Sequence, residues 1–399
     1  MLKKIAIFSL ILAAFSLYAE GEYEGKLQET VVTATGFSDN IENQIKNITV
    51  ITNQDIIDKG YNNVEEILRR APGVNFVNNN FGNITDIRGQ GPEKASGRVK
   101  ILVDGVPMNI LDLSHALVPI NTVAVEDIEK IEIINGGGSV LYGNGTAGGV
   151  VNIITKKGRK EGASGKAYYQ NSSYNTNKLG FSTGLNLNNK LTLDLGYENI
   201  NGRGYRENDK TSSEFLKGGL IYNITDNQSL KFKATRYNEE YRESSGITAA
   251  QLAHNRKQRG ETLTFGDVVR KEYSLEYNVK PTENFELSIL GYKQKMKREY
   301  DQKDSETDTD GLFQDRKTGA RLKGNYNYGS GNLVFGYEYT DNDMLRKALN
   351  SYTVNMGRRT VKAGSDTTVN LSKDTHSLYL LERHTFFDKL EGTLGYRYE

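Results

Sequence analysis

The sequence lacks cysteine and has little proline and almost no net charge. The absence of cysteine among 399 residues excludes disulfides and thiolate metal sites. Five prolines against 41 glycines and 24 tyrosines favour strands and turns, with aromatic rings available for membrane-interface girdles. Because 51 Lys and Arg balance 50 Asp and Glu, the composition offers no case for nucleic-acid binding. The mean hydropathy of −0.59 argues against a helical membrane protein but permits a barrel of alternating strands.

The N-terminus has the pattern of an export signal. Lys3 and Lys4 precede an apolar run over residues 5–17, and Ala19 offers a small residue at a cleavage point. The run is short for a membrane-spanning helix, so an uncleaved anchor is the less favoured alternative. We expect residues 1–19 to be a signal peptide and the mature chain to lie outside the cytoplasm.

Residues 37–157 have the pattern of a small mixed α/β domain. Asn63 is a candidate N-cap for a helix whose apolar face is formed by Val64, Ile67 and Leu68 and which stops before Pro72. Short apolar runs predict strands over residues 49–51, 99–103, 128–134 and 150–154. Asp104-Gly105, directly after the second of these runs, predicts a tight turn.

After Gly158 the apolar residues recur with a period of two. Leu191, Leu193 and Leu195 alternate with polar residues, and the alternation returns over residues 273–279, 285–289, 320–328, 333–339 and 394–398. One apolar and one polar face on strands of this length is typical of a transmembrane β-barrel. A soluble β-sandwich also has amphipathic strands and is the alternative.

The connections between these strands favour the barrel. Tight turns alternate with long polar segments over residues 201–213, 239–270, 295–317 and 341–373, which we interpret as extracellular loops. We count about eleven strands from near Ala163, whereas plugged barrels use about 22. We therefore expect residues 158–399 to form the N-terminal half of a transmembrane barrel, and the sequence to be truncated after Glu399.

A run of β-branched residues precedes the α/β domain. It comprises Glu29, Thr30, Val31, Val32, Thr33, Ala34 and Thr35, and it follows a leader of Glu and Gly. Such an extended run can be added as a strand to the edge of a partner's sheet. The alternative is a first strand paired within its own domain.

These motifs together resemble those of the TonB-dependent outer-membrane receptors. Residues 29–35 resemble the TonB box, and residues 63–74, 87–89, 99–107, 125–134 and 139–157 resemble successive motifs of the plug domain. The resemblance implies a periplasmic leader over residues 20–36, an α+β plug over residues 37–157 and an antiparallel transmembrane β-barrel. One departure is Asn135-Gly136-Gly137 where the family often has Arg-Gly-Pro, so a base that pins the plug to the barrel is missing there.

The resemblance also implies a function, a location and partners. It implies import of a scarce solute, above all a ferric siderophore or related iron complex, across the outer membrane of a Gram-negative-type bacterium. Haem, cobalamin or a glycan are alternative solutes. TonB, with its inner-membrane energising complex, and outer-membrane lipids would be the partners of a barrel that is monomeric when complete. No cofactor is implied.

Candidate ligand residues lie in plug loops and in one barrel loop. Small polar loops and nearby bases suit an anionic ligand, and a cationic, aromatic-lined barrel loop would steer one inward. These residues are Asn79, Asn80, Phe81, Arg88, Gln90, Arg98, Tyr237, Tyr241, His254 and Arg256. Solvated turns and charged surface are the alternative, and the acidic run over residues 301–310 would repel an anion.

The sequence predicts no enzyme and no metal site. Residues 143–148 match a dinucleotide-binding glycine pattern, but a strand-like run follows where a helix is required. No set of nucleophile, base and acid stands out on a suitable element. A surface-binding barrel that transports nothing, a barrel enzyme and a truncated relic are the competing hypotheses.

Overall fold

The computed structural model describes residues 30–31, 37, 39–40, 48–79, 82–95, 97–112, 118–157, 162–356, 359–387 and 390–399. The expected signal peptide and five residues of the expected coupling segment (Glu29, Val32, Thr33, Ala34 and Thr35) lie outside this part of the chain. Within it, no helix is long and apolar enough to cross a membrane.

The N-terminal domain is a mixed five-stranded sheet in the order β3-β8-β9-β6-β7. Its strands are β3 (Ile48–Thr52), β6 (Val99–Val103), β7 (Val106–Pro107), β8 (Ile128–Ile134) and β9 (Gly149–Thr155). The four predicted strands are therefore confirmed. Ile131, Ile133, Val151 and Ile153 are fully buried, so β8 and β9 carry the centre of the core.

Short helices and two hairpins complete this domain. The helices are α2 (Asn53–Lys59), α3 (Val64–Arg69), α4 (Pro92–Ala95) and α5 (Ser139–Tyr142), with 3₁₀ turns η2 (Ile120–Thr122) and η3 (Val125–Asp127). The hairpins pair β1 (Thr30–Val31) with β2 (Asp39–Asn40) and β4 (Val74–Asn79) with β5 (Gly82–Ile87). The side chain of Asn63 accepts from the Glu66 amide, which confirms the predicted N-cap of α3.

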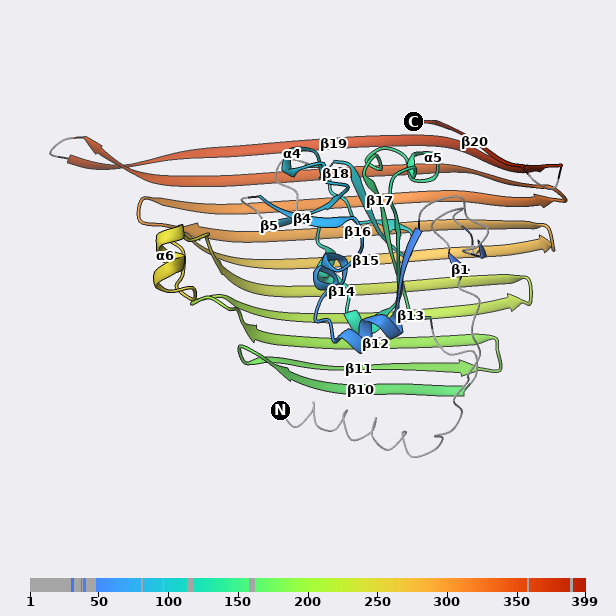
Figure 1. Ribbon diagram of the computed structural model, residues 1–399, viewed down its shortest axis with the longest axis horizontal. Coiled ribbons are helices and arrows are strands. Elements are labelled where there is room, and N and C mark those ends of the chain that lie inside the picture. The colour runs from blue at the N-terminus through green and yellow to red at the C-terminus, as the bar shows by residue number, and fades with distance from the viewer. Residues whose placement is uncertain are drawn as a thin grey trace.

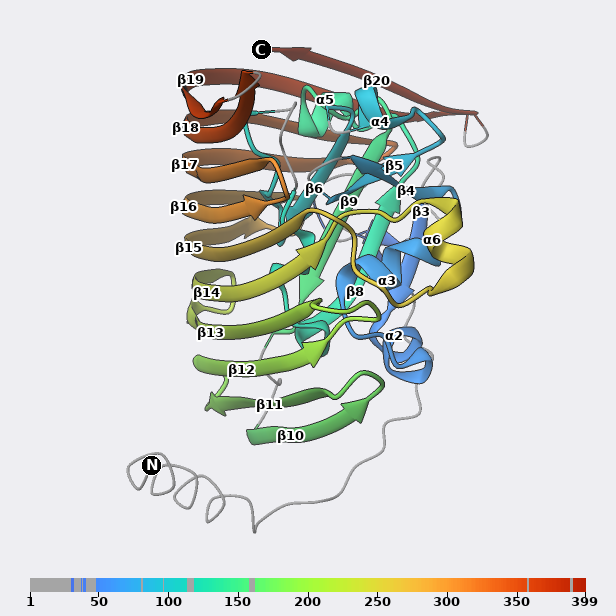
Figure 2. The same cartoon turned by 90° about the vertical axis from the view of Figure 1, so that its left-hand side faces the viewer.

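Eleven antiparallel strands follow, paired in sequence order from β10 to β20. They are β10 (Gly162–Ser172), β11 (Thr176–Leu187), β12 (Leu191–Arg203), β13 (Lys210–Thr225), β14 (Gln228–Ser244), β15 (Leu263–Thr282), β16 (Phe285–Lys303), β17 (Thr307–Tyr328), β18 (Gly331–Met356), β19 (Arg359–Phe386) and β20 (Leu390–Tyr398). The predicted strand number and start are confirmed. The strands form a curved wall, and the N-terminal domain lies against its concave face (Figures 1 and 2).

The predicted long loops are wrong for two of the four connections. The segments 295–317 and 341–373 lie mostly in β16 to β19, where residues 304–306 and 357–358 alone separate paired strands. A hairpin that stands in water keeps its backbone hydrogen bonds while both faces are polar, so polarity did not distinguish it from a loop. The connections over residues 204–209 and 245–262 are also shorter than predicted, and the second contains α6 (Ala249–His254).

The two faces of the wall differ in the way that the alternation predicts. Leu195 is 55% exposed, Leu275 49% and Ile289 44%, although all three are apolar. Their sequence neighbours point to the other face, which the N-terminal domain covers. A contiguous exposed apolar surface of this kind suits a hydrocarbon environment.

Candidate coupling and ligand sites

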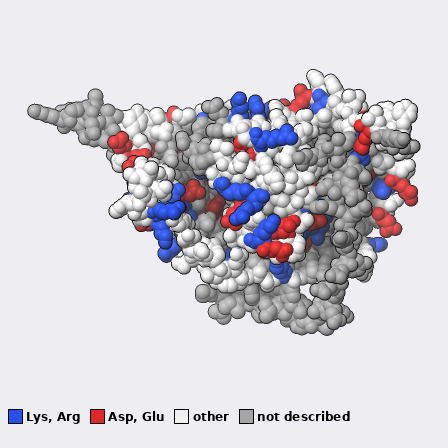
Figure 3. Space-filling view, viewed as in Figure 1, with Lys and Arg blue, Asp and Glu red and all other residues white. Residues whose placement is uncertain are grey.

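Basic side chains of the wall hold the N-terminal domain in place. Lys217 Nζ of β13 lies 2.8 Å from Asp127, and Lys233 Nζ of β14 lies 2.5 Å from Asp104. Figure 3 shows basic and acidic side chains adjacent to one another near the middle of the face that carries this domain. The charges of the wall and of the domain are therefore complementary at their interface.

Further bases of the wall bind backbone carbonyls or a carboxylate of the domain. Lys317 donates to the Asn109 carbonyl, Arg321 donates to the Gly105 carbonyl at 3.1 Å, and Arg346 lies 2.9 Å from Asp112. The sequence departure at residues 135–137 therefore does not leave the interface without ion pairs, because the wall supplies the bases. Sequence reasoning missed these residues. Their one signal was their position on the polar face of the alternating strands.

Asp104 occupies a tight turn between β6 and β7. Asp104 and Gly105 have φ values of 49° and 78°, as the predicted Asp-Gly turn requires. The Asp104 carboxylate accepts from Lys233 and from the Thr155 amide and hydroxyl, both at 2.8 Å. Burial alone would raise the pKa of Asp104, but the charge of Lys233 and these hydrogen bonds outweigh it and lower the pKa.

Asp127 is paired less completely. Lys217 is shared between Asp127 and Asp194, the latter at 3.3 Å, and Asp127 Oδ2 is buried without a hydrogen-bond partner. Burial raises the pKa of Asp127 to about 6, although the charge of Lys217 opposes the shift. The carboxylate of Asp127 therefore carries an unrecovered desolvation cost at neutral pH.

A cavity of about 300 Å³ lies between the domain and the wall. Asp104, Lys156, Lys217, Lys233 and Lys323 are among the side chains that line it. Phe37, two residues after the expected coupling segment, also lines the cavity and is 6% exposed. The Phe37 ring lies 4.2 Å from Lys323 Nζ, so the start of this domain touches the wall directly.

The described part of the expected coupling segment is Thr30 and Val31. They pair with Asn40 and Asp39 in the two-residue ladder of β1 and β2, and Val31 is fully buried. This pairing is the alternative raised from the sequence. It does not test strand addition to a partner, because a ladder of two residues can exchange one neighbour for another.

The structure joins two of the candidate ligand residues in the plug. Arg98 Nη1 donates to Gln90 Oε1 at 3.1 Å, and the backbone N–H of Gln90 donates to the buried carboxylate of Asp86. Arg88 is exposed and packs over Gly136, where an added Cβ would come within 2.9 Å of the guanidinium. Asn80 and Phe81 lie outside the described residues, as does the Asn79 side chain.

The candidate ligand residues of the wall fall into two groups. Tyr237 is buried within β14 and packs with Phe215 on Ala124 of the plug. Tyr241 is also buried, and its hydroxyl accepts from Arg298 Nε at 2.8 Å. His254 and Arg256 are exposed at the end of α6 and just after it. Ligand binding by each of these residues stays a prediction.

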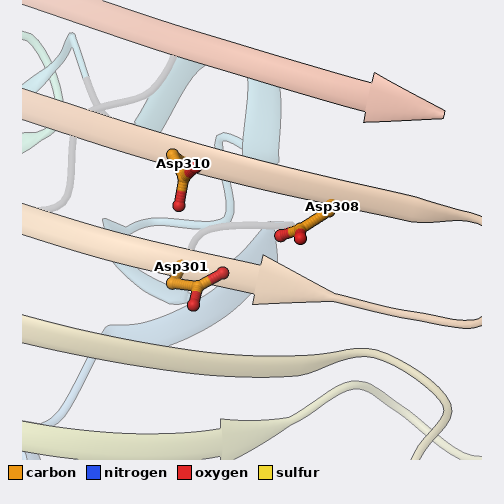
Figure 4. Close-up of side chains that lie close together, drawn as sticks. All are labelled: Asp301, Asp308 and Asp310. Atoms are coloured by element: carbon orange, nitrogen blue, oxygen red, sulfur yellow. The ribbon is translucent and has the colours of Figure 1, made fainter. Parts of the chain in front are cut away.

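Three carboxylates gather on the hairpin of β16 and β17. Ligand atoms of Asp301, Asp308 and Asp310 lie within 4.8 Å of one another (Figure 4). Oxygen atoms suit a hard cation. However, Lys303 Nζ lies 2.8 Å from Asp301 and already neutralises part of this charge.

The fold and the interface define a plug held inside an antiparallel β-barrel wall, with an N-terminal segment that reaches the plug. Residues 40–150 match the family model of the TonB-dependent Receptor Plug Domain. The chain therefore carries the plug domain of TonB-dependent receptors, followed by an eleven-stranded antiparallel sheet that matches part of their barrel.

Known relatives agree with this assignment. The chain is 28% identical over 367 residues to the ferric enterobactin receptor of Pseudomonas aeruginosa, covering 86% of this chain and 45% of the relative. The unliganded ferric citrate transporter FecA has a TM-score of 0.68 at 21% identity and covers 88% of this chain and 59% of its own. The siderophore receptor PiuA from Acinetobacter baumannii has a TM-score of 0.76 at 13% identity, with coverages of 93% and 59%. The chain thus spans about half the length of the curated relative.

Proposed function

We propose that this chain is part of an outer-membrane receptor that imports a ferric siderophore or a related iron complex with energy delivered through TonB. The family match and the relatives that bear siderophore-receptor names support this class of solute. The proposed organisation is a signal peptide over 1–19, a leader with the TonB box over 20–36, a plug over 37–157 and half of the barrel over 158–399.

The observation that carries the proposal is the arrangement of plug, wall and coupling segment. The plug is fixed to the inner face of the wall by ion pairs such as Lys233 with Asp104. β1 lies toward the end of the molecule with the tight turns, whereas α4, the β4–β5 hairpin and α6 lie toward the other end (Figure 1). A solute bound at the α6 end and a force applied at β1 would act on opposite ends of one plug.

The coupling step proposed here is an exchange of strands. TonB would add a strand to the extended run at residues 29–35, through backbone hydrogen bonds that do not depend on side-chain identity. Pairing of Val31 with Asp39 competes with this addition. Among the described residues that ladder comprises two pairs, so a partner strand that pairs with more of residues 29–35 would displace it.

The solute-binding step would use the candidate plug residues. Arg98 is exposed and oriented by Gln90, and Arg88 presents a second exposed guanidinium. Guanidinium groups bind carboxylate, catecholate or hydroxamate oxygens of a ferric chelate through charge-assisted hydrogen bonds. His254 and Arg256 would add positive charge from the α6 connection.

A proline substitution tests the coupling step. Val32→Pro removes a backbone donor from the segment, and we expect uptake of radiolabelled ferric enterobactin by iron-limited cells to fall by about tenfold or more. Binding of the same chelate to whole cells should persist, since the change lies outside the plug. The matched control is Asp39→Pro, which interrupts the ladder of β1 and β2 and leaves residues 29–35 unchanged.

The control separates the two roles of this segment. Asp39→Pro should retain uptake, because it removes the competitor of strand addition. Equal loss of uptake in both variants would mean that the internal ladder matters and that strand addition is wrong. Normal uptake with Val32→Pro would also contradict the coupling proposal.

A further inference from the structure

Four basic residues lie directly opposite one another on four neighbouring strands of the wall. Arg236 of β14 pairs with Lys271 of β15, Lys271 with Lys295 of β16, and Lys295 with Arg316 of β17. We call these four residues the basic row. All four side chains are exposed or half-exposed.

The basic row faces away from the plug. The next residue along each strand points inward: Tyr237 packs on the plug residue Ala124, Glu272 is buried, and Lys317 donates to a plug carbonyl. Gln294, next to Lys295, is also buried and donates to Glu272. Because side chains alternate along a strand, the basic row lies on the outer face of the wall.

The row lies at the outer rim of the apolar band. On β16, the outward positions between the tight turn and Lys295 are occupied by Phe285, Leu287, Ile289, Gly291 and the base Lys293. Ten residues at about 3.4 Å each, on a strand tilted by about 45°, rise roughly 24 Å. That height matches the apolar band of an outer-membrane barrel, about 25 Å tall, so the row falls where lipid headgroups begin.

Lys271 and Lys295, the two middle members of the row, have bases directly opposite them on both sides, whereas Asp343 of β18 lies opposite Arg316 at one end of the row. Like charges directly opposite one another destabilise a sheet, and here the arrangement occurs in three successive pairs. An acidic row of Glu240, Asp267 and Glu299 begins four residues further along the strands, at about 13 Å, too far for ion pairing. Lys293 and Lys297 add two more outward bases, of which Lys297 pairs with Glu299 at 2.7 Å.

We propose that the basic row binds the phosphate groups of a phosphorylated glycolipid in the outer leaflet. Lys and Arg bind phosphate oxygens through charge-assisted hydrogen bonds, and a surface anion would relieve the repulsion within the row. The acyl chains of such a lipid would lie on the apolar residues below the row. This inference rests on the proposed outer-membrane location of the protein.

The test compares two double variants of the full chain in neutral detergent micelles. Lys271→Gln/Lys295→Gln removes two charges from the row. Arg203→Gln/Lys347→Gln removes two from exposed outward positions on β12 and β18. Titration with bisphosphorylated lipid A should show about 30-fold weaker binding for the row variant. The control variant should stay within about twofold of the unmodified chain.

Further binding measurements distinguish the lipid phosphate from other possible ligands of the basic row. Fully dephosphorylated lipid A should bind the unmodified chain as weakly as bisphosphorylated lipid binds the row variant, and inorganic phosphate should compete poorly. Lys271→Arg/Lys295→Arg should retain binding because it keeps the charges. Equal losses in the row and control variants, equal binding of dephosphorylated lipid, or a lipid-independent dimer that the row variant abolishes would each overturn the proposal.

The inference and the proposed function fail separately. Binding of ferric enterobactin should be the same in the row variant and in the unmodified chain, because the row faces away from the plug. If the row variant and the unmodified chain bind lipid A equally well while both bind the chelate, this inference alone fails. If the row variant binds lipid A more weakly as expected but the unmodified chain neither binds nor imports the ferric chelate, the proposed solute is wrong and the lipid inference stands. An unchanged circular dichroism spectrum excludes misfolding of the row variant.

Discussion

Replacement of Lys233 by Met is expected to loosen the plug from the wall. Lys233 Nζ lies 2.5 Å from Asp104 and 3.6 Å from Glu272, and its side chain is 14% exposed. Methionine preserves most of the side-chain volume and removes the charge. In the docked state of this variant, the Asp104 carboxylate would lack the cation that Lys233 supplies.

The free-energy cost of Lys233→Met depends on the hydrogen bonds and ion pairs that the carboxylates of Asp104 and Glu272 retain. Removing one member of a buried ion pair costs about 3–5 kcal/mol. Asp104 retains two hydrogen bonds from Thr155, and Glu272 retains Arg270 at 2.5 Å. Asp104 is also 27% exposed, so we expect the lower end of the range, about 3 kcal/mol.

Hydrogen exchange measures this loss at the interface. β9 carries Thr155, and its amides should exchange about 100-fold faster in Lys233→Met at pH 7 if exchange follows release of the plug. The matched control is Lys231→Met, on the same strand and the same face. Lys231 pairs with Glu276 at 3.3 Å, and both side chains are about one-third exposed, so its loss should change exchange by less than about fivefold.

The pH dependence gives an independent check. The pKa of Asp104 in the folded protein lies below its ordinary value of 3.8, so the stability from the ion pair is fully present above pH 4 or so. It is lost as the pH falls through the lower, folded pKa, and the difference between Lys233→Met and the unmodified chain should shrink there. Equal exchange in Lys233→Met and Lys231→Met at pH 7 would refute the reasoning.

Two further substitutions probe the plug. Asp127→Asn should stabilise the docked plug at pH 7 by up to about 3 kcal/mol, since a pKa of about 6 against 3.8 corresponds to about 2 units. Because the pKa of Asp127 is raised, the docked plug of the unmodified chain loses this stability as the pH rises from about 4 to 6. Asp127→Asn should therefore make the stability of the docked plug less dependent on pH in this range. Lower stability of the variant at pH 7 would contradict this prediction. Ile133→Ala, at a fully buried core position, should cost about 2–5 kcal/mol in denaturant unfolding followed by circular dichroism. The same change at Ile57, which is 43% exposed, should stay within about 0.5 kcal/mol, and equal costs would place Ile133 outside the core.

Local signals in the sequence were enough for most of the elements. The N-cap at Asn63 and the Asp104-Gly105 turn were read correctly because each is formed by contacts within a few residues. The eleven strands followed from the period of two. By contrast α2, which begins with the capping pair of Thr52 and Asp55, had a readable signal that sequence reasoning missed.

Pairings between distant residues were not readable in the same way. The parallel pairing of β6 with β9 joins Val99 with Gly149, and no local pattern specifies it. The strand extensions through residues 295–317 were missed because polarity on both faces is shared by loops and by hairpins in water. Tyr237 was read as part of a ligand-binding mouth, whereas its contact with Ala124 depends on how the plug meets the wall.

The sequence by itself determined the class of this protein, the order of the plug and the strands that follow it, and the alternation within those strands. These features depend on the spacing of residues that are close together in the chain and on short sequence motifs. Only the tertiary structure decided which bases hold the plug and which form the outward row. Lys233 and Lys271 are both bases on amphipathic strands, but one meets a plug carboxylate and the other stands between two further bases. The physical reason is that a strand's alternation assigns a side chain to a face, whereas its counter-charge is set by strand register and by docking of a separate domain.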